Sequence, residues 1–549
     1  MVTQQDGKQR QLNNITKNFN SKTILNNVSF NLSQNEVIGL VGPNGSGKST
    51  LLKIISGQIP ADKGKVKLNN ETAFYLNQEI SPEFYKLSVV DYLKQITNLT
   101  KLEAIISNFE QHPDEANMED YGNALEEYLK KDGYNFESNL SFILAGLNFD
   151  EPLDKKIKKL SGGEKMKILL AAMLLSNDDI FLLDEPTNNL DIEAITWLEK
   201  YLKSLNKQMI IVSHDEEFLN NLTTKIIELD GGKIKEYNLS YYAYVEYKEI
   251  EYTHALEAYE NAKEKKSKIK QEINTAQKWA SKGMKKKSSD NDKIAANYQK
   301  EQTKKTAGKI SRLNKELDEV EIDSDFRKKE KITFFLKQDI LKGNKDIKLE
   351  DLVCGYDSFH TDAVDLTIPF GSKVLIEGSN GVGKTTLMKT ITGGLKPISG
   401  NVIIGSSAKI GYISQNTYDD FSEDDTIYTF LTKDKTIDKG YLFTLLDKFN
   451  ISYEDKDKKY KELSPGMRTR VNLARLALED INILLLDEVT NHLDIEATKI
   501  IEEVIDTFKG TIICITHNRN FKSKLNADLV INMQKANLSK NHKPKPIQK

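Results

Sequence analysis

The feature that most constrains this 549-residue chain is a short glycine-rich pattern that occurs twice. Residues 42–49 read Gly-Pro-Asn-Gly-Ser-Gly-Lys-Ser, and residues 378–385 read Gly-Ser-Asn-Gly-Val-Gly-Lys-Thr. Each copy follows a short apolar run and precedes an apolar stretch compatible with a helix, which is the strand, loop and helix setting that the pattern requires. There the glycines let backbone N–H groups turn inward around phosphate, and the helix N-terminus favours the same anion. The sequence therefore predicts two phosphate-binding loops.

The two loops are followed by the same series of landmarks. In chain order these are Ser161, Glu185 and His214 in the first half, and Ser464, Glu488 and His517 in the second. The interval from serine to glutamate is 24 residues in both halves, and the interval from glutamate to histidine is 29 residues in both. Equal intervals indicate a duplicated domain.

The serines belong to motifs that identify a family. Residues 160–164 read Leu-Ser-Gly-Gly-Glu, and each glutamate ends an apolar run closed by Asp-Glu. On these motifs the chain resembles the ATP-binding cassette ATPases over nearly its whole length. The resemblance implies two α/β cassettes that pack head to tail, with each ATP between a phosphate loop and the other cassette's serine. Ser464 would then close the nucleotide at Ser49, and Ser161 the nucleotide at Thr385.

The resemblance also implies a role for each motif residue. Glu185 and Glu488 would orient and polarise the attacking water, while His214 and His517 would donate to the γ-phosphate. Mg²⁺ would be bound by Ser49, Gln78, Asp184, Thr385, Gln415 and Asp487. ATP would be contacted by Phe19, Gly42, Asn44, Gly45, Gly47, Lys48, Ser49, Thr50, Gln78, Ser161, Gly162, Gly163, Asp184, Tyr356, Gly378, Asn380, Gly381, Gly383, Lys384, Thr385, Thr386, Gln415, Ser464, Gly466 and Asp487.

Two of these assignments have a plain structural alternative. A single histidine after an apolar strand usually has a structural role, and a single aromatic residue more often belongs to a core. Phe19 and Tyr356 stand where the family stacks an aromatic ring on adenine, and the repeated frame favours the functional interpretation of both histidines and both aromatic residues.

Composition limits the cellular setting. No apolar run approaches the roughly 18 residues of a membrane span, and the first ten residues are polar. Cys354 and Cys514 are the only cysteines, so neither a disulfide framework nor an iron–sulfur cluster is expected. We expect a cytoplasmic protein without a membrane-spanning part.

The segment between the two halves is long and basic. It contains no proline from 243 to 335, and its apolar spacing predicts two antiparallel helices that break near 281–290. The facing apolar residues would be Tyr252, Leu256, Tyr259, Ile269 and Ile273 on one limb and Ile310, Leu313, Leu317 and Val320 on the other. From 263 to 315 there are 17 Lys and Arg against 5 Asp and Glu, a net charge of +12, whereas the whole chain carries −3. A basic prong on an acidic body indicates a polyanionic partner, although charged helical hairpins are often simply solvated.

The predicted turn of this hairpin combines bulky and basic side chains. The candidate nucleic-acid contacts are Trp279, Lys282, Met284, Lys285, Lys286 and Lys287. Trp279 and Met284 could stack on or wedge against unpaired nucleotides. Trp279 could equally cap the core of the hairpin itself.

Two cassettes joined by such a hairpin resemble the F subfamily of cassette proteins. That resemblance implies a cytosolic ATPase that binds the ribosome at the tRNA exit site and directs the linker toward the peptidyl-transferase centre, near rRNA and P-site tRNA. It implies ribosomal protection against large-subunit antibiotics or relief of stalled translation, and a monomer whose cassettes pair within the chain. The alternative is the ATPase subunit of a transporter with separate membrane partners, which would need only a short linker.

The expected fold class is α/β, with two phosphate-loop cassettes joined by a long antiparallel helical hairpin. The predicted parts are an N-terminal tail at 1–9, a first cassette at 10–242, a hairpin linker at 243–344, a second cassette at 345–533 and a basic tail at 534–549. The second serine motif differs from the first, because Pro465 lacks a backbone donor and Met467 replaces a polar side chain. We therefore expect hydrolysis at the Lys48 site to be perturbed relative to the Lys384 site.

Overall fold

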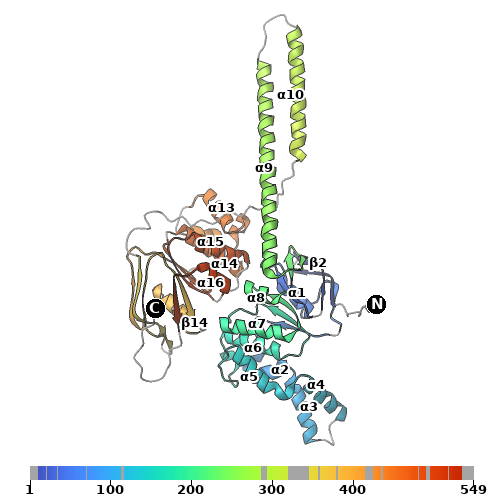
Figure 1. Ribbon diagram of the computed structural model, residues 1–549, viewed down its shortest axis with the longest axis vertical. Helices are drawn as coiled ribbons and strands as arrows, with labels where there is room; N and C mark the ends of the chain where they lie inside the picture. The colour runs from blue at the N-terminus through green and yellow to red at the C-terminus, as the bar shows by residue number, and fades with distance from the viewer. Residues whose placement is uncertain are drawn as a thin grey trace. The chain divides into compact units, whose positions relative to one another are not determined.

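The chain divides into two compact units, one formed by residues 1–242 and 331–549 and the other by residues 243–330. This computed structural model (Figure 1) describes residues 10–19, 22–33, 35–69, 71–112, 117–285, 293–319, 345–356, 359–378, 381–414, 424–433, 437–479, 481–489, 495–516 and 518–533. The first unit contains two α/β cassettes, and the second is a helical hairpin. The predicted fold class is confirmed.

The first cassette is built on a six-stranded sheet with the order β5-β6-β7-β3-β8-β9. Its strands are β3 (Val37–Val41), β5 (Ala73–Leu76), β6 (Ile180–Asp184), β7 (Gln208–Val212), β8 (Lys225–Asp230) and β9 (Lys233–Tyr237). All neighbours are parallel except β8 and β9. Every residue of β6 and β7 is buried, as expected for parallel strands that are covered on both faces.

The described residues of this cassette also form a second, antiparallel sheet and eight helices. The sheet has the order β2-β1-β4, with β1 (Arg10–Phe19), β2 (Lys22–Leu32) and β4 (Lys63–Lys67). The helices are α1 (Lys48–Ile55), α2 (Val89–Ile96), α3 (Leu99–Gln111), α4 (Met118–Lys130), α5 (Phe136–Gly146), α6 (Gly162–Leu175), α7 (Ile192–Leu205) and α8 (Glu216–Leu222). Short 3-10 helices lie at Pro82–Lys86, Gly133–Asn135 and Ile157–Lys159.

The second cassette repeats this plan. Its parallel sheet has the order β16-β17-β18-β14-β19, with β14 (Lys373–Gly378), β16 (Ile410–Ser414), β17 (Ile483–Asp487), β18 (Thr511–Ile515) and β19 (Leu529–Met533). Its antiparallel strands are β10 (Ile347–Val353), β11 (Gly355–Tyr356), β12 (Phe359–His360), β13 (Val364–Ile368) and β15 (Ser399–Ile404). Its helices are α11 (Lys384–Ile391), α12 (Ile427–Thr432), α13 (Lys439–Lys448), α14 (Pro465–Leu478), α15 (Ile495–Thr507) and α16 (Arg519–Leu525), with 3-10 turns at Tyr453–Asp457 and Tyr460–Glu462.

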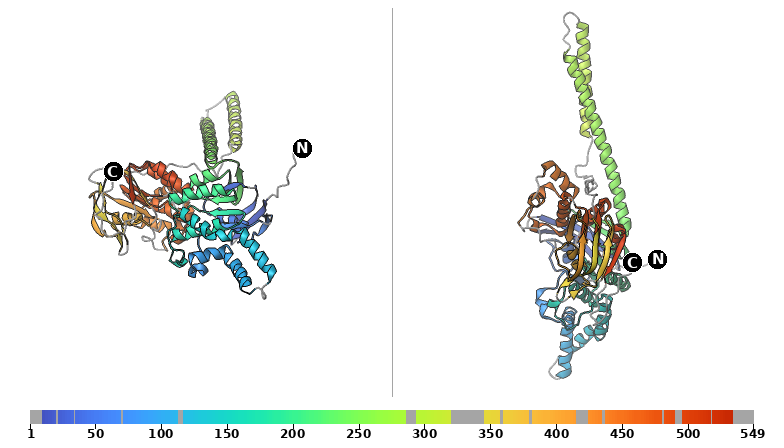
Figure 2. Two further views of the ribbon diagram at one scale, coloured as in Figure 1. Left: turned by 60° about the horizontal axis from the view of Figure 1, so that its bottom comes forward. Right: turned by 90° about the vertical axis from the view of Figure 1, so that its left-hand side faces the viewer.

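The shared strand order brings the same chain ends together in both cassettes. In each parallel sheet the strand before the phosphate loop lies beside the strand that precedes the histidine position, and the Asp-Glu strand lies next to that. Figure 2 shows these parallel strands of the second cassette edge to edge. Since functional groups gather at the carboxyl ends of parallel strands, this order positions the loop, the carboxylates and the histidine at one edge.

The hairpin consists of two long helices. Helix α9 (Tyr241–Lys285) has 45 residues and helix α10 (Lys293–Glu319) has 27, and Figures 1 and 2 show them side by side. Ile269, Ile273 and Leu313 form a buried cluster against which Leu317 packs. Of the apolar positions predicted to face one another, Val320 lies outside the described residues, and Tyr252, Leu256, Tyr259 and Ile310 are not part of this cluster.

Candidate functional site

Each glycine-rich loop ends in a glycine whose backbone favours a residue without a Cβ. Gly47 and Gly383 have φ angles of 103° and 101°, in the left-handed region, and they cap α1 and α11. A Cβ on Gly383 would also lie 3.0 Å from the ring of Phe359. The helices therefore begin at Lys48 and Lys384, and their first N–H groups, which have no acceptor within the helix, suit a phosphate.

The lysine of each motif folds back over its own loop. Lys48 Nζ donates to the carbonyl oxygens of Gly42 and Pro43, at 2.8 and 3.0 Å, and Lys384 Nζ donates to that of Gly378 at 2.8 Å. Both lysine side chains are buried. Burial lowers the pKa of Lys384, while the neighbouring carboxylates act in the opposite direction. Each ammonium group is thus held where a phosphate oxygen would meet it.

The two candidate catalytic glutamates share an unusual backbone conformation. Glu185 and Glu488 follow β6 and β17 directly, with φ angles of 56° and 50°. Their N–H groups donate to the carbonyl oxygens of Val212 and Ile515, at 2.8 and 2.9 Å. A left-handed conformation is costly for a residue with a Cβ, and such residues concentrate at functional sites. The same conformation at both positions supports one shared role for the two glutamates.

The aspartate before each glutamate is bonded to a tyrosine from the neighbouring strand. Tyr75 Oη donates to Asp184 at 2.8 Å, and Tyr412 Oη donates to Asp487 at 3.0 Å. The Thr385 hydroxyl also donates to Asp487, at 3.2 Å. Burial raises the pKa of Asp487, although its hydrogen bonds oppose the shift. A hydroxyl and a carboxylate that converge at the end of a phosphate loop fit a Mg²⁺ site.

His214 contacts the glutamate of its own cassette. Its backbone N–H donates to Glu185 Oε2 at 3.2 Å, and its Nε2 lies 3.0 Å from Glu185 Oε1. Both carboxylate oxygens of Glu185 are therefore engaged by one residue. The equivalent residue of the second cassette, His517, lies outside the described residues.

These groups line two cavities. The first, of about 430 Å³, is lined by Phe19, Ile24, Asn44, Gly45, Gly47, Lys48, Ser49, Thr50, Gln78, Asp184, Glu185, Val212, His214 and Ser464. The second, of about 610 Å³, is lined by Asn148, Phe149, Asp150, Glu151, Ser161, Gly163, Glu164, Lys167, Thr187, Asn189, Leu190, Phe359, Gly381, Gly383, Lys384, Thr385, Thr386 and Glu488. Among the described residues, Ser464 is what the second cassette contributes to the first cavity, whereas Ser161 is one of several residues of the first cassette that line the second cavity.

Several predicted site residues lie elsewhere. Gly42, Gly162, Tyr356, Gly378, Gly466 and Asp487 do not line either cavity. Asn380 and Gln415 lie outside the described residues, as do Lys286 and Lys287. For Trp279, Lys282, Met284 and Lys285 the structure describes only a backbone within α9.

Sequence reasoning missed three aromatic residues near the cavities. Phe359 lines the second cavity, whereas the predicted Tyr356 is 53% exposed and lies outside the lining. Tyr75 and Tyr412 bind the aspartates, and each stands three residues before the predicted glutamine of its cassette. That repeated offset was a usable signal for the tyrosines. No repeated spacing marked Phe359.

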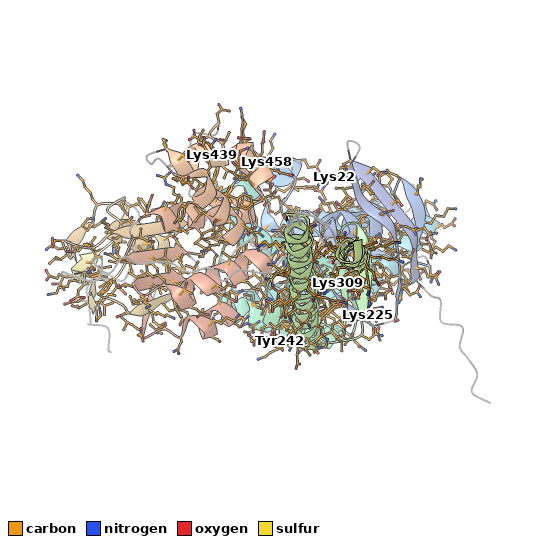
Figure 3. The ribbon with its side chains drawn as sticks, turned by 90° about the horizontal axis from the view of Figure 1, so that it is seen from above. Lys22, Lys225, Tyr242, Lys309, Lys439 and Lys458 are labelled. Carbon is orange, nitrogen blue, oxygen red and sulfur yellow. The ribbon has the colours of Figure 1, made fainter. Side chains whose placement is uncertain are left out.

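The described part of the hairpin presents lysines to an open groove. Lys268 on α9 and Lys305 and Lys309 on α10 line it together with Gln271, Glu272, Thr275, Ala276 and Thr306. Figure 3 looks along the hairpin, with the two helices end-on, and labels Lys309 on α10. Among the described helices, none is both long enough and apolar enough to span a bilayer.

The two shared cavities and duplicated sheets define a tandem nucleotide-binding ATPase, and comparison with known proteins agrees. A family model described as "ABC transporter" matches residues 25–188 and 361–491. The putative ATP-binding protein YdiF of Bacillus subtilis is 31% identical over 94% of this chain and 78% of its own length. ABC transporter F family member 2 of Arabidopsis thaliana is 32% identical over 93% of this chain and 74% of its own length.

A solved structure shares the fold at lower identity. It contains an archaeal ribosome recycling factor, aABCE1, in complex with the ribosomal stalk protein aP1. The TM-score is 0.57 at 20% identity, covering 95% of this chain and 89% of that one. The chain belongs to the ATP-binding cassette family, in its F subfamily. It is an ATP hydrolase with two cassettes.

Proposed function

We propose that this protein is a cytoplasmic ATPase that acts on the ribosome, at the tRNA exit site, with its hairpin directed toward the peptidyl-transferase centre. ATP closes the two cassettes around the shared sites, and hydrolysis reopens them. The outcome is protection of the ribosome against large-subunit antibiotics or relief of stalled translation. The chain acts as a monomer whose cassettes pair with each other.

The charge of the hairpin is the main observation that supports this proposal. Residues 263–315 have a net charge of +12, while the remainder of the chain sums to −15. Phosphate contacts by lysine and arginine give salt-sensitive affinity for nucleic acid, and an acidic body opposes binding elsewhere. Helix α9 alone has 45 residues, whereas an ATPase subunit recruited by a membrane partner would need only a short connection. The archaeal neighbour, whose own name describes a ribosome recycling factor, is consistent with this proposal.

The chemistry within each cassette follows from the residues around the cavities. Glu185 would align water for in-line attack on the γ-phosphate. His214, which contacts the Glu185 carboxylate, would donate to that phosphate when ATP is bound. Lys48 would bind phosphate, while Ser49 and Asp184 would bind Mg²⁺, which neutralises charge on the β- and γ-phosphates. Glu488, Lys384, Thr385 and Asp487 would have these roles in the second cassette.

The proposal is tested at the predicted turn of the hairpin. A variant in which Lys282, Lys285, Lys286 and Lys287 are all changed to Ala removes four charges. We expect it to co-sediment with 70S ribosomes more weakly and with a shallower salt dependence, because up to four phosphate contacts are lost. ATP hydrolysis measured without ribosomes should persist, since the cassettes carry the catalytic groups.

A matched control removes four exposed lysines from the first cassette, by changing Lys63, Lys65, Lys67 and Lys203 to Ala. Its salt dependence should stay close to that of the parent. If both variants, or neither, alter the salt dependence, the hairpin has no special role in nucleic-acid binding. Replacing Trp279 or Met284 by Ala should instead impair ribosomal protection more than binding, if those side chains act by shape.

The cellular outcome is measured by growth. Expression of the parent should raise the concentration of at least one drug of the peptidyl-transferase centre or exit tunnel that is needed to inhibit growth. The four-lysine hairpin variant should lose that effect, while the cassette control should keep it. Equal drug sensitivity with and without the protein, across these classes, would contradict protection and leave relief of stalling as the remaining outcome.

A further inference from the structure

Helices α8 and α16, which occupy equivalent positions in the two cassettes, meet each other. Each begins two residues after the histidine position of its cassette. The α8 helix begins with an acidic run, Asp215-Glu216-Glu217, whereas the equivalent run before and in α16 is Asn518-Arg519-Asn520. The duplicated fold thus places opposite charges at the same position of its two copies.

Arg519 binds a group of carboxylates from the first cassette. Its guanidinium group is hydrogen-bonded to Glu199 of α7, and its Nε lies 3.1 Å from Glu217 Oε2. Asp215 Oδ2 is 3.7 Å from the same guanidinium group. The side chains of Arg519 and Glu199 are 17% and 9% exposed, so this ion pair is far less screened by salt than a surface pair. Asn221 also donates to Glu199, at 3.3 Å.

The equivalent position in the first cassette has the opposite charge. Glu216 stands where the second cassette has Arg519, and it accepts hydrogen bonds from Asn520 of the second cassette and from Tyr241. Burial raises the pKa of Glu216, and Glu502 acts in the same direction, while Lys524 and Lys499 oppose it. Glu502 is the equivalent of Glu199, and here it is paired with a cation.

That cation is a second compensating difference. Lys524, which is bonded to Glu502, occupies the position of Asn221 in the first cassette. Glu216 therefore meets a Glu502 that Lys524 of its own cassette already neutralises, whereas Arg519 meets a Glu199 that receives only the neutral Asn221 from α8 of its own cassette. Two like first cassettes would set Glu216 against Glu199, and neither copy of α8 has a basic residue to place between them. Two like second cassettes would set Arg519 against a Glu502 that already has Lys524.

We infer that this surface, formed by α7 and α8 of the first cassette and α15 and α16 of the second, selects pairing between unlike cassettes. Specificity of this kind requires a penalty for the wrong partner as well as attraction for the right one, and the reversed charges supply both. The partner that fits the acidic face of α8 is the second cassette with its Arg519. Each cavity takes its serine from the unlike cassette, so both ATP sites depend on this pairing. That dependence holds for the cassettes themselves and goes beyond the proposed role on the ribosome.

The test exchanges the two charges within the full-length chain. The variant E216R/R519E keeps the net charge but places each residue opposite its wrong partner. Without ribosomes, we expect the ATP concentration for half-maximal turnover to rise roughly tenfold at low salt, in line with couplings measured for close charge pairs. Raising KCl from about 0.05 to 0.5 M should reduce this defect, since salt screens repulsion. Light scattering should detect dimers, because like cassettes now fit each other.

The matched control is the exchange R312E/E316R in α10, which swaps an exposed ion pair with no net change in charge. It should hydrolyse ATP like the parent at every salt concentration and should have the parent's mass. An E216R/R519E protein that matches this control, or whose defect does not change with salt, would overturn the inference. If that variant fails to fold, R519Q, E199Q and their combination replace it. Additive effects of those two changes would count against the inference, and less than additive effects would support it.

Discussion

The two nucleotide cavities share one plan but receive different helix ends from the opposite cassette. Ser161 precedes α6 and caps it reciprocally: its N–H donates to Glu164 Oε2 at 2.6 Å, and its Oγ accepts from the Glu164 N–H at 3.3 Å. Ser464 caps α14 by accepting from the Met467 N–H at 3.3 Å, but Pro465 is the first residue of that helix. The cavity with Lys384 therefore faces a helix end with every N–H present, whereas the cavity with Lys48 faces one that lacks a donor.

The difference teaches that folding and function place separate demands on this helix end. Proline is well tolerated at the first helical position, because the N–H that it lacks has no acceptor within the helix. The helix loses nothing by carrying Pro465. A phosphate in front of the helix loses a hydrogen bond, so the cost of the substitution is expected in hydrolysis rather than in stability.

The largest effect is expected when the catalytic glutamates of both sites are changed together. Changing Glu185 and Glu488 to Gln should lower ATP turnover by roughly a thousandfold, in the range reported for loss of a general base. Since glutamine keeps the size of the side chain and removes only its negative charge and one acceptor oxygen, ATP binding should be retained. Turnover and equilibrium binding of ATP would be measured on the same preparation. Substantial hydrolysis in this variant would contradict the assignment of both glutamates and remove the basis for comparing the sites.

The two single variants remove one site at a time and so test each site separately. We expect Glu488→Gln to lower turnover roughly 30-fold and Glu185→Gln to lower it by only about 3%, because the site with Lys48 is already the slower one and carries little of the total turnover. Single-turnover kinetics of each variant would measure the site that remains. Equal losses would show that the two sites are equivalent despite Pro465.

Two aromatic residues, Phe359 and Tyr356, are candidates for stacking on adenine at the second site. If Phe359 stacks on the base at the second site, Phe359→Ala should raise the KM for ATP about tenfold, consistent with the cost of removing one base-stacking ring. Tyr356→Ala should change it less than twofold, since this ring is exposed and outside the cavity. Measurement in the Glu185→Gln background isolates the second site. The reverse order of effects would restore Tyr356 as the stacking residue.

The smallest effect is expected from restoring the backbone donor that Pro465 lacks. Pro465→Gly supplies an N–H at the start of α14 and should raise hydrolysis at the Lys48 site by about threefold, the value of one modest hydrogen bond. The Glu488→Gln background would make that site visible, and thermal unfolding would serve as the control, because glycine should slightly weaken the helix. An unchanged rate would mean that Ser464 alone provides the contact from the opposite cassette.

Local sequence predicted the parts of this protein that depend on short-range geometry. Phosphate loops, the serine motifs and strand-ending carboxylates are each encoded within a few residues, since backbone angles and hydrogen-bond spacing decide them. The duplicated intervals between Ser161, Glu185 and His214 and their counterparts added the domain repeat, and the periodic apolar residues of 243–335 added the hairpin. None of these inferences required knowing which strands are neighbours.

Only the tertiary structure decided which distant residues meet. Tyr75 and Asp184 are 109 positions apart, and their contact depends on β5 lying beside β6. Arg519 and Glu199 are 320 positions apart, and no local pattern marks either of them as a partner of the other. Phe359 lines a cavity that Tyr356 does not, although both belong to one short hairpin. Such contacts arise from packing whole elements together, and packing depends on shape and charge across the molecule rather than on neighbours along the chain.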